Sequence, residues 1–211
     1  GFHDMKIRKG GLDVYPRLVA AEHRTPFVGE VTPSGNVELD KLLGGGLERG
    51  TNALLIGSAG VGKSSLALTY AIAAAQRGER PASFPFDEAR GTLEARARTL
   101  GLELESATES GHIIFQQIDP AEMSPGEFAS IVRRRVEEDG VRVVVIDSLN
   151  GYLNAMPDDR FLILQMHELL TFLGQQGILT ILILAQHGLV GPAETPLDIS
   201  YLSDAVLMLR Y

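Results

Sequence analysis

The sequence predicts an α/β domain with a mostly parallel central sheet and helices on both faces of that sheet. From residue 51 onward, apolar segments of strand length alternate with segments of helical length, which is typical of βαβ units. The strand segments are apolar almost throughout, as at Val143–Ile146, whereas a sheet with one wet face would alternate polar and apolar residues. At 211 residues, the chain has the length of one such domain.

The predicted elements follow one another along the chain, and several of their ends carry sequence signals. The expected strands are residues 51–56, 82–86, 112–118, 141–146, 178–185 and 205–209, and the expected helices are residues 37–43, 64–76, 92–100, 124–139 and 158–176. Gly101 and Gly140 follow two of these helices. Ser124, Pro125 and Glu127 predict a capping box at the start of another. Because proline has no N–H to donate, Pro85 predicts that strand 82–86 is short or bulged.

The first 30 residues differ from the rest of the chain. Residues 1–24 are mixed and polar, and Gly10 and Gly11 interrupt them, so we expect an extended arm or the tail of a preceding domain rather than a core element. We place the α/β domain at residues 31–211. Its first helix ends at Gly44–Gly46, where the absence of side chains would let the backbone approach closely whatever lies beyond.

Composition and charge argue against several classes of protein. With 45% apolar and 22% charged residues, the chain has the composition of a globular protein and not of a disordered one. The absence of cysteine excludes a disulfide framework and a thiolate zinc site, and it fits a reducing cytoplasm. The longest apolar run, residues 178–185, is too short to span a membrane. We therefore expect a cytoplasmic protein without a membrane segment.

The net charge of −8 argues against nucleic acid and anionic lipid as partners. One local cluster, Arg133–Arg135, is basic although the chain as a whole is acidic. It is followed by Glu137, Glu138 and Asp139, which offset its charge, so a solvated helix face is the favoured interpretation of the cluster.

Residues 57–64 match the phosphate-binding motif G-x-x-x-x-G-K-[ST] and lie between a predicted strand and a predicted helix. Glycines in this motif allow a tight loop whose N–H groups converge on phosphate oxygens, and the N-terminus of the next helix adds its positive end. Lys63 supplies a positive charge for the β- and γ-phosphates, and the Ser64 hydroxyl is placed to coordinate Mg²⁺. The residues that we expect to contact a nucleoside triphosphate are Gly57, Ser58, Ala59, Gly60, Val61, Gly62, Lys63, Ser64 and Ser65.

Polar residues that end other predicted strands are candidates for the remaining chemistry. Asp147 ends strand 141–146, where its carboxylate can hold a Mg²⁺-bound water beside Ser64, although a turn or N-cap aspartate is the alternative. Asp87 and Glu88 follow strand 82–86 and are candidates to orient or deprotonate the attacking water, or else solvated surface charge. Gln186 follows strand 178–185 and is a candidate sensor of the γ-phosphate or an ordinary strand-end residue.

Taken in order, these segments resemble the ATPase domain of the circadian-clock KaiC family. The resemblance covers about residues 31–211 and is carried by Leu42–Leu47 before Gly50, residues 57–64, Phe86–Glu88, Val145–Leu149, Leu202–Val206 and Leu209–Arg210. It implies a RecA-like P-loop fold, ATP with Mg²⁺, a ring hexamer of identical chains with nucleotide at the subunit interfaces, and a regulatory protein partner.

The resemblance also assigns roles to individual residues. Glu88 matches the catalytic glutamate of the family, Asp87 its acidic neighbour, and Asp147 its strand-end aspartate. Ser200 and Tyr201 stand where an adjacent serine and threonine of the family accept phosphate by autophosphorylation, although Ser200 can equally be a plain loop serine. Residues 7–17 look like the end of a preceding domain, so we expect this chain to be the second domain of a tandem protein that continues past residue 211.

We therefore expect a KaiC-like ATPase that hydrolyses Mg-ATP slowly to drive conformational or assembly switching, with autophosphorylation as a further activity. A RecA/RadA-type DNA-dependent ATPase is one alternative, but it would need basic residues in residues 148–160 and 187–203, which contain Arg160 and no other lysine or arginine. A non-catalytic ATP-binding signalling module is the other alternative. Intact Lys63, Ser64, Glu88 and Asp147 argue against it.

Overall fold

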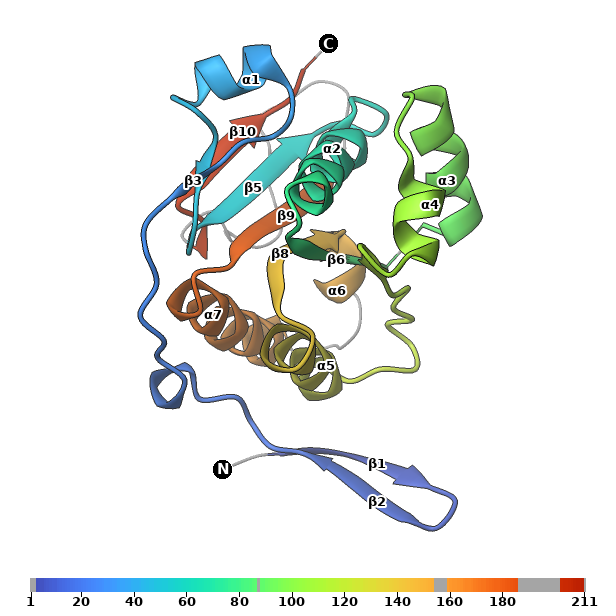
Figure 1. Cartoon of the computed structure of the whole chain (residues 1–211). Helices are drawn as coiled ribbons and strands as arrows, with labels where there is room; N and C mark the ends of the chain where they lie inside the picture. Colours follow the sequence, from blue (N-terminus) through green and yellow to red (C-terminus); the bar gives the residue numbers. More distant parts are fainter. Residues whose placement is uncertain (1–2, 87, 154–158, 186–201, 211) are drawn as a thin grey trace.

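A six-stranded sheet forms the centre of the molecule (Figure 1). The structure is a computed structural model that describes residues 3–86, 88–153, 159–185 and 202–210. The strands of the sheet are β5 (Asn52–Gly57), β6 (Arg80–Pro85), β7 (Ile114–Phe115), β8 (Val141–Asp147), β9 (Leu179–Ala185) and β10 (Ala205–Met208). Their order across the sheet is β10-β5-β9-β8-β6-β7, and each neighbouring pair is parallel. The predicted α/β class with a parallel sheet is confirmed.

Helices cover both faces of this sheet, as predicted (Figure 1). One face carries α2 (Lys63–Gln76), α3 (Arg90–Thr99) and α4 (Leu104–Glu109), and the other carries α5 (Pro125–Glu137), α6 (Leu149–Leu153) and α7 (Asp159–Gln175). In β8, Val143 and Val145 pack with α2, while Val144 and Ile146 pack with α5 and α7. The central strands β5, β8 and β9 are apolar almost throughout because both of their faces are buried. In the part of the chain that the structure describes, no helix has the length and apolar character needed to cross a bilayer.

Strand β6 contains Pro85, the proline for which the sequence analysis predicted a short or bulged strand. The strand is interior, with β8 on one side and β7 on the other, and it extends over Arg80–Pro85. Its register shifts at Arg80/Pro81, so the expected bulge is present at the start of the strand and not at Pro85. Pro85 is the last residue of β6, where its carbonyl still accepts a hydrogen bond from Ile118 N at 2.8 Å. A proline at the end of a strand interrupts little of the ladder.

Several short elements depart from the sequence prediction. The expected strand at residues 112–118 reduces to the two residues of β7, and α4 and α6 were not expected. A two-residue pair, β3 (Val31–Thr32) with β4 (Leu47–Glu48), was also missed. Elements of two to six residues are too short to show a hydrophobic period, so they form because their neighbours pack against them.

The N-terminal segment is a β-hairpin, where the sequence predicted an extended arm. Strands β1 (Asp4–Arg8) and β2 (Gly11–Tyr15) pair antiparallel, and the hairpin protrudes from the body of the molecule (Figure 1). The segment that follows, with a 3₁₀ turn at Ala20–Glu22, buries Leu18 and Ala20 in the core beside α7. The expectation that nothing before residue 25 joins the core is therefore wrong, while the domain boundary at residue 31 stays a prediction.

Polar contacts attach the hairpin to the start of α5. Asp4 Oδ2 accepts a hydrogen bond from Gly126 N at 2.7 Å. Glu127, whose exposed fraction is 6%, accepts hydrogen bonds from Tyr15 Oη at 3.0 Å and Lys6 Nζ at 3.3 Å. Ser124 Oγ accepts from Glu127 N at 3.2 Å, as expected for the N-cap. The predicted capping box is thus half correct, because the Glu127 carboxylate binds the hairpin instead.

The predicted close approach at the three glycines occurs at Gly46. Helix α1 (Val37–Leu42) ends before the three glycines, and directly after Gly46 the chain enters β4, which pairs with β3. Gly46 has φ +139°, and a Cβ at this position would overlap the backbone of Thr32. Gly44 has φ +69°, but a Cβ there would meet nothing within 4 Å.

We predict that Gly46→Ala lowers the free energy of unfolding by about 2–5 kcal/mol, because it combines an unfavourable backbone conformation with overlap against backbone atoms that cannot rotate away. Gly44→Ala is the matched control and should lose about 1–2 kcal/mol, from the backbone conformation alone. Urea denaturation measures both values. Equal losses in the two variants would show that packing against Thr32 is not what requires the glycine.

Candidate functional site

The carboxyl ends of four neighbouring strands meet at one edge of the sheet. Gly57 at the end of β5 pairs with Ala185 at the end of β9, and Asp147 at the end of β8 pairs with Pro85 at the end of β6. Phe86 N also donates a hydrogen bond to Asp147 O at 2.6 Å, which fixes the chain just before Glu88. The loop after β5 and the acidic residues after β6 and β8 therefore share this edge, which is where parallel sheets bind ligands.

The loop of residues 57–62 connects β5 directly to α2. Gly62 is the N-cap of α2 with φ +99°, a left-handed conformation that glycine adopts without cost. The first backbone bond of the helix runs from Leu66 N to Gly62 O at 2.9 Å. Because α2 has 14 residues, its first N–H groups and the positive end of its dipole face this loop. The predicted strand–loop–helix context of the motif is confirmed, and it is suited to bind an anion.

Lys63 is buried at the base of the loop, with an exposed fraction of 7%. Its ammonium donates hydrogen bonds to Gly57 O at 2.8 Å and to Ser58 O at 2.7 Å. Burial lowers the pKa of Lys63, and the negative charge of Asp147 partly opposes that effect. The Lys63 ammonium is therefore held in the loop by neutral carbonyl acceptors. The carboxylate that influences its charge is that of Asp147.

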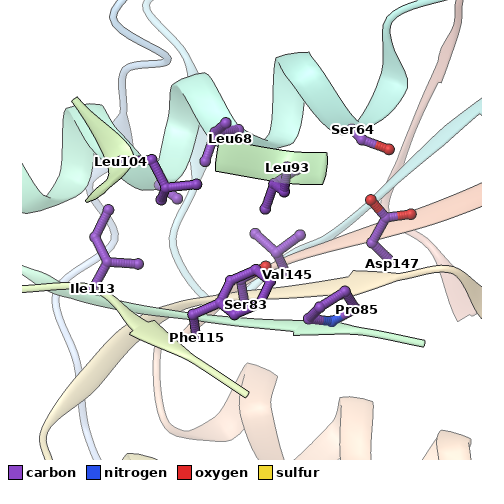
Figure 2. Close-up of a pocket in the computed structure, with 11 residues that line it drawn as sticks. Ser64, Leu68, Ser83, Pro85, Leu93, Leu104, Ile113, Phe115, Val145 and Asp147 are labelled. Carbon is purple, nitrogen blue, oxygen red and sulfur yellow. The ribbon is translucent and has the colours of Figure 1, made fainter. Parts of the chain in front are cut away.

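Ser64 and Asp147 line the same cavity beneath α2. Figure 2 shows Ser64 on the helix and Asp147 on the strand at one end of this cavity, and mostly apolar side chains, together with Ser83, along the rest of it. These apolar residues include Leu68, Leu93 and Phe115. A hydroxyl and a carboxylate at the edge of an apolar cavity are ligands of the kind that Mg²⁺ uses together with phosphates and waters.

The donor set fits Mg²⁺ bound together with a nucleotide and does not fit a self-sufficient metal site. Within the described ranges, no group of three or more His, Cys, Asp or Glu side chains could hold a metal ion. Ser64 and Asp147 would thus supply part of the coordination, and phosphate oxygens and water the remainder.

Glu88 lies at the same edge, and the structure pairs it with an arginine that the sequence did not suggest. Its side chain is 17% exposed, and Arg96 Nη2 of α3 lies 2.5 Å from Glu88 Oε1. Burial raises the pKa of Glu88, Arg96 acts against this rise, and the charge of Asp147 adds to it. The pKa of Glu88 stays above its ordinary value. Asp147 thus interacts electrostatically with both Lys63 and Glu88.

A second residue missed by the sequence interpretation is Asn150 in α6. Its Oδ1 accepts a hydrogen bond from Ala185 N at 2.8 Å, and its Nδ2 donates one to Ala185 O at 3.2 Å. The side-chain amide therefore continues the ladder at the end of β9, next to the site. Nothing in the sequence indicated this contact, because it joins two segments 35 residues apart.

Several predicted residues lie outside the described part of the chain. These are Asp87, Gln186, Ser200 and Tyr201. The expectation for Arg133–Arg135 can be compared with the structure: Arg133 pairs with Glu137 at 3.7 Å and Arg135 with Asp139 at 2.9 Å. The acidic residues offset the cluster as predicted.

Comparisons with known proteins agree with this geometry. KaiC of Picosynechococcus sp. is 25% identical over 162 residues, which are 76% of this chain and 31% of the relative. KaiC3 of Synechocystis sp. is 26% identical over 208 residues, or 97% of this chain and 40% of the relative. The DNA repair protein RadA of Mycobacterium tuberculosis is 38% identical over 93 residues, or 41% of this chain and 19% of the relative.

The chain thus spans between about a fifth and two fifths of the length of these relatives. A model of the KaiC ATPase family matches residues 32–211, which is most of the chain. The parallel sheet and the loop between β5 and α2 have the RecA-like P-loop fold that this family implies. The chain belongs to the KaiC family of ATPase domains.

Proposed function

We propose that this domain binds Mg-ATP at residues 57–64 and hydrolyses it to ADP and phosphate, with Glu88 accepting a proton from the attacking water. One observation carries the proposal. Asp147 lines one cavity with Ser64 and pairs with Pro85 at the end of the strand that precedes Glu88. Its charge also acts on the pKa of both Lys63 and Glu88, so a cation for phosphate, a carboxylate for Mg²⁺ and a candidate base share one edge of the sheet. The matched family is an ATPase family, which supports the same conclusion at a coarser level.

Binding would follow from the charges around the loop. A polyphosphate offers the Lys63 ammonium charged acceptors in place of the neutral carbonyls of Gly57 and Ser58, and charge-assisted hydrogen bonds are the stronger ones. The N–H groups at the start of α2 donate to the same oxygens. Ser64 would hold Mg²⁺ directly and Asp147 through a water, and the ion supplies neutralisation of the β- and γ-phosphate charge.

Hydrolysis then needs a base at the γ-phosphate. The water oxygen forms a bond to Pγ, the bond from Pγ to the β–γ bridging oxygen breaks, and its electron pair leaves with ADP. The proton of the water goes to the Glu88 carboxylate. A half-buried carboxylate with a raised pKa is a better proton acceptor than an exposed one, which supports Glu88 in this role. We propose Asp87 as the acidic neighbour of Glu88, and Gln186 as a sensor of the γ-phosphate.

We extend the proposal to slow turnover that drives conformational or assembly switching in a homo-hexamer with a regulatory protein partner. The KaiC relatives are described as circadian clock proteins, and a timing role suits slow hydrolysis. Autophosphorylation at Ser200 or Tyr201 is a further proposed activity. Incubation with ATP labelled at the γ-position separates the two reactions, because hydrolysis releases labelled phosphate and a kinase leaves the label on the protein.

A DNA-dependent ATPase is the second candidate function, because the RadA relative is a DNA repair protein and shares 38% identity over its 93 matched residues. The net charge of −8 and the near absence of basic residues from residues 148–160 and 187–203 favour the first candidate. Single-stranded DNA should therefore leave the ATPase rate unchanged. Stimulation by DNA that disappears at high salt would favour the second candidate.

We predict that Lys63→Ala weakens ATP binding by about 100-fold or more, because the phosphates lose their buried cation. Isothermal titration calorimetry measures the affinity. Lys41→Ala is the matched control, since Lys41 is an exposed lysine that pairs with Glu38 on α1, and its affinity should equal that of the wild type. An unchanged affinity in Lys63→Ala would contradict the assigned loop.

For Asp147→Asn, the expected result is a weaker dependence of nucleotide binding on Mg²⁺, because a neutral amide holds a metal-bound water less well than a carboxylate. Titration of Mg²⁺ at fixed ATP measures this dependence, with an apparent Mg²⁺ affinity that falls about tenfold or more. Asp139→Asn, at a carboxylate that pairs with Arg135 on the other face, should leave it intact. If both variants keep the wild-type dependence, Asp147 does not serve the metal.

Glu88→Gln should lower kcat by about 100-fold or more while ATP affinity stays within about twofold, because the amide occupies the same space without accepting the proton. Phosphate release and calorimetry give the two values. Glu94→Gln provides the control, since Glu94 is another partly buried glutamate that pairs with an arginine of α3, and its kcat should be unchanged. Equal near-zero rates in the wild type and Glu88→Gln, with binding retained, would instead favour a non-catalytic module.

A further inference from the structure

Arg96 is the charged residue of α3 that contacts the candidate base, Glu88. Helix α3 begins at Arg90, two residues after Glu88. Arg96 lies further along this helix, and its Nη2 is 2.5 Å from Glu88 Oε1. The other arginines of α3 pair elsewhere. Arg90 binds Glu94 on its own helix, and Arg98 binds Glu105 on α4. One ion pair of this helix therefore joins it to the candidate base.

The position of Arg96 is fixed relative to the phosphate loop. Leu93 and Ala97, on the buried side of α3, have exposed fractions of 5% and 1%. They pack in one apolar cluster with Leu68 and Ile72 of α2. Because α2 begins at the loop itself, the helix that carries Arg96 is packed against the helix that carries Lys63 and Ser64. A rigid support of this kind is what orientation of a reacting group needs.

The contact leaves Glu88 able to act. Arg96 contacts Oε1, so Oε2 can accept a hydrogen bond from water without loss of the ion pair. The contact uses one nitrogen, Nη2, and the planar guanidinium that carries it is pre-organised, unlike the flexible lysine ammonium. Arg96 opposes the rise in the pKa of Glu88 that burial and Asp147 cause, which favours the ionised form.

We infer that Arg96 is a positioning residue for ATP hydrolysis, which holds the Glu88 carboxylate oriented at the edge where Asp147 and the phosphate loop meet. This inference rests on the proposed function. A purely structural role is the alternative, but the Arg96 side chain is 37% exposed, and an ion pair with an exposed partner contributes little to stability. Loss of Arg96 should consequently leave the fold intact and change the reaction.

The experiment measures kcat, KM for Mg-ATP, ATP affinity and thermal unfolding of Arg96→Ala, Arg96→Lys and the control Arg98→Ala. Arg96→Ala should lower kcat about 10- to 100-fold with KM and ATP affinity within about twofold, because nucleotide binding does not use Glu88. Arg96→Lys should recover part of the loss, since it keeps the charge and loses the planar guanidinium. Arg98→Ala removes another arginine that α3 uses to pair with a neighbouring segment, and it should match the wild type.

Three outcomes would overturn the inference, and they can be told apart from failure of the proposed function. If Arg96→Ala keeps wild-type or higher kcat while Glu88→Gln loses it, Arg96 does not position the base and the proposed function stands. If Arg96→Ala and Arg96→Lys lose thermal stability, kcat and affinity alike, the role is structural. If Glu88→Gln itself keeps the wild-type rate, the proposed base is wrong and the inference fails with it.

Discussion

The site depends on one constraint, which is that β5, β9, β8 and β6 run parallel and that their carboxyl ends lie within two residues of one another in register. Parallel strands need a crossover after each strand, so the residues that follow each carboxyl end come from segments far apart in the chain. The pairs Gly57 with Ala185 and Asp147 with Pro85 fix the relative heights of these ends. A shift of one strand by two residues would move Asp147 away from the loop, although both faces of the sheet would remain buried.

Charge compensation at this edge follows from that geometry. Lys63 is buried, and a buried cation is costly unless an anion lies near it. Asp147 is that anion, yet the same carboxylate makes ionisation of Glu88 harder. Arg96 is a second cation, and its charge acts against the rise in the pKa of Glu88. The four side chains thus form a set of two cations and two carboxylates, in which the like charges of Asp147 and Glu88 oppose each other and Lys63 and Arg96 each compensate one of them. A change at Asp147 will therefore alter the electrostatics of both the phosphate loop and the candidate base.

The sequence predicted what local patterns determine. The loop of residues 57–64, the strands around it and the strand-end position of Asp147 follow from periodicity and glycine placement, and the structure has them. Arg96 and Asn150 were not found, because their partners depend on how α3 and α6 pack and not on spacing along the chain. The docking of the hairpin was missed for the same reason. Tyr15 and Glu127 are 112 residues apart, and no local signal links them.

The candidate site lies on the α2 face of the sheet, whereas the N-terminal segment packs on the opposite face, beside α5 and α7. Lys63, Ser64 and Arg96 come from helices on the α2 face, and Asp147 lines the cavity beneath α2. The hairpin contacts α5, and Leu18 and Ala20 join the core on the α5 and α7 side. Val143 and Val145 pack toward the first face and Val144 and Ile146 toward the second, so β8, like β5 and β9, contributes to both. A contact path nevertheless crosses this separation. Glu127 binds the hairpin, the next residue, Phe128, packs against Phe86 with ring centroids 5.3 Å apart, and Phe86 lies two residues before Glu88.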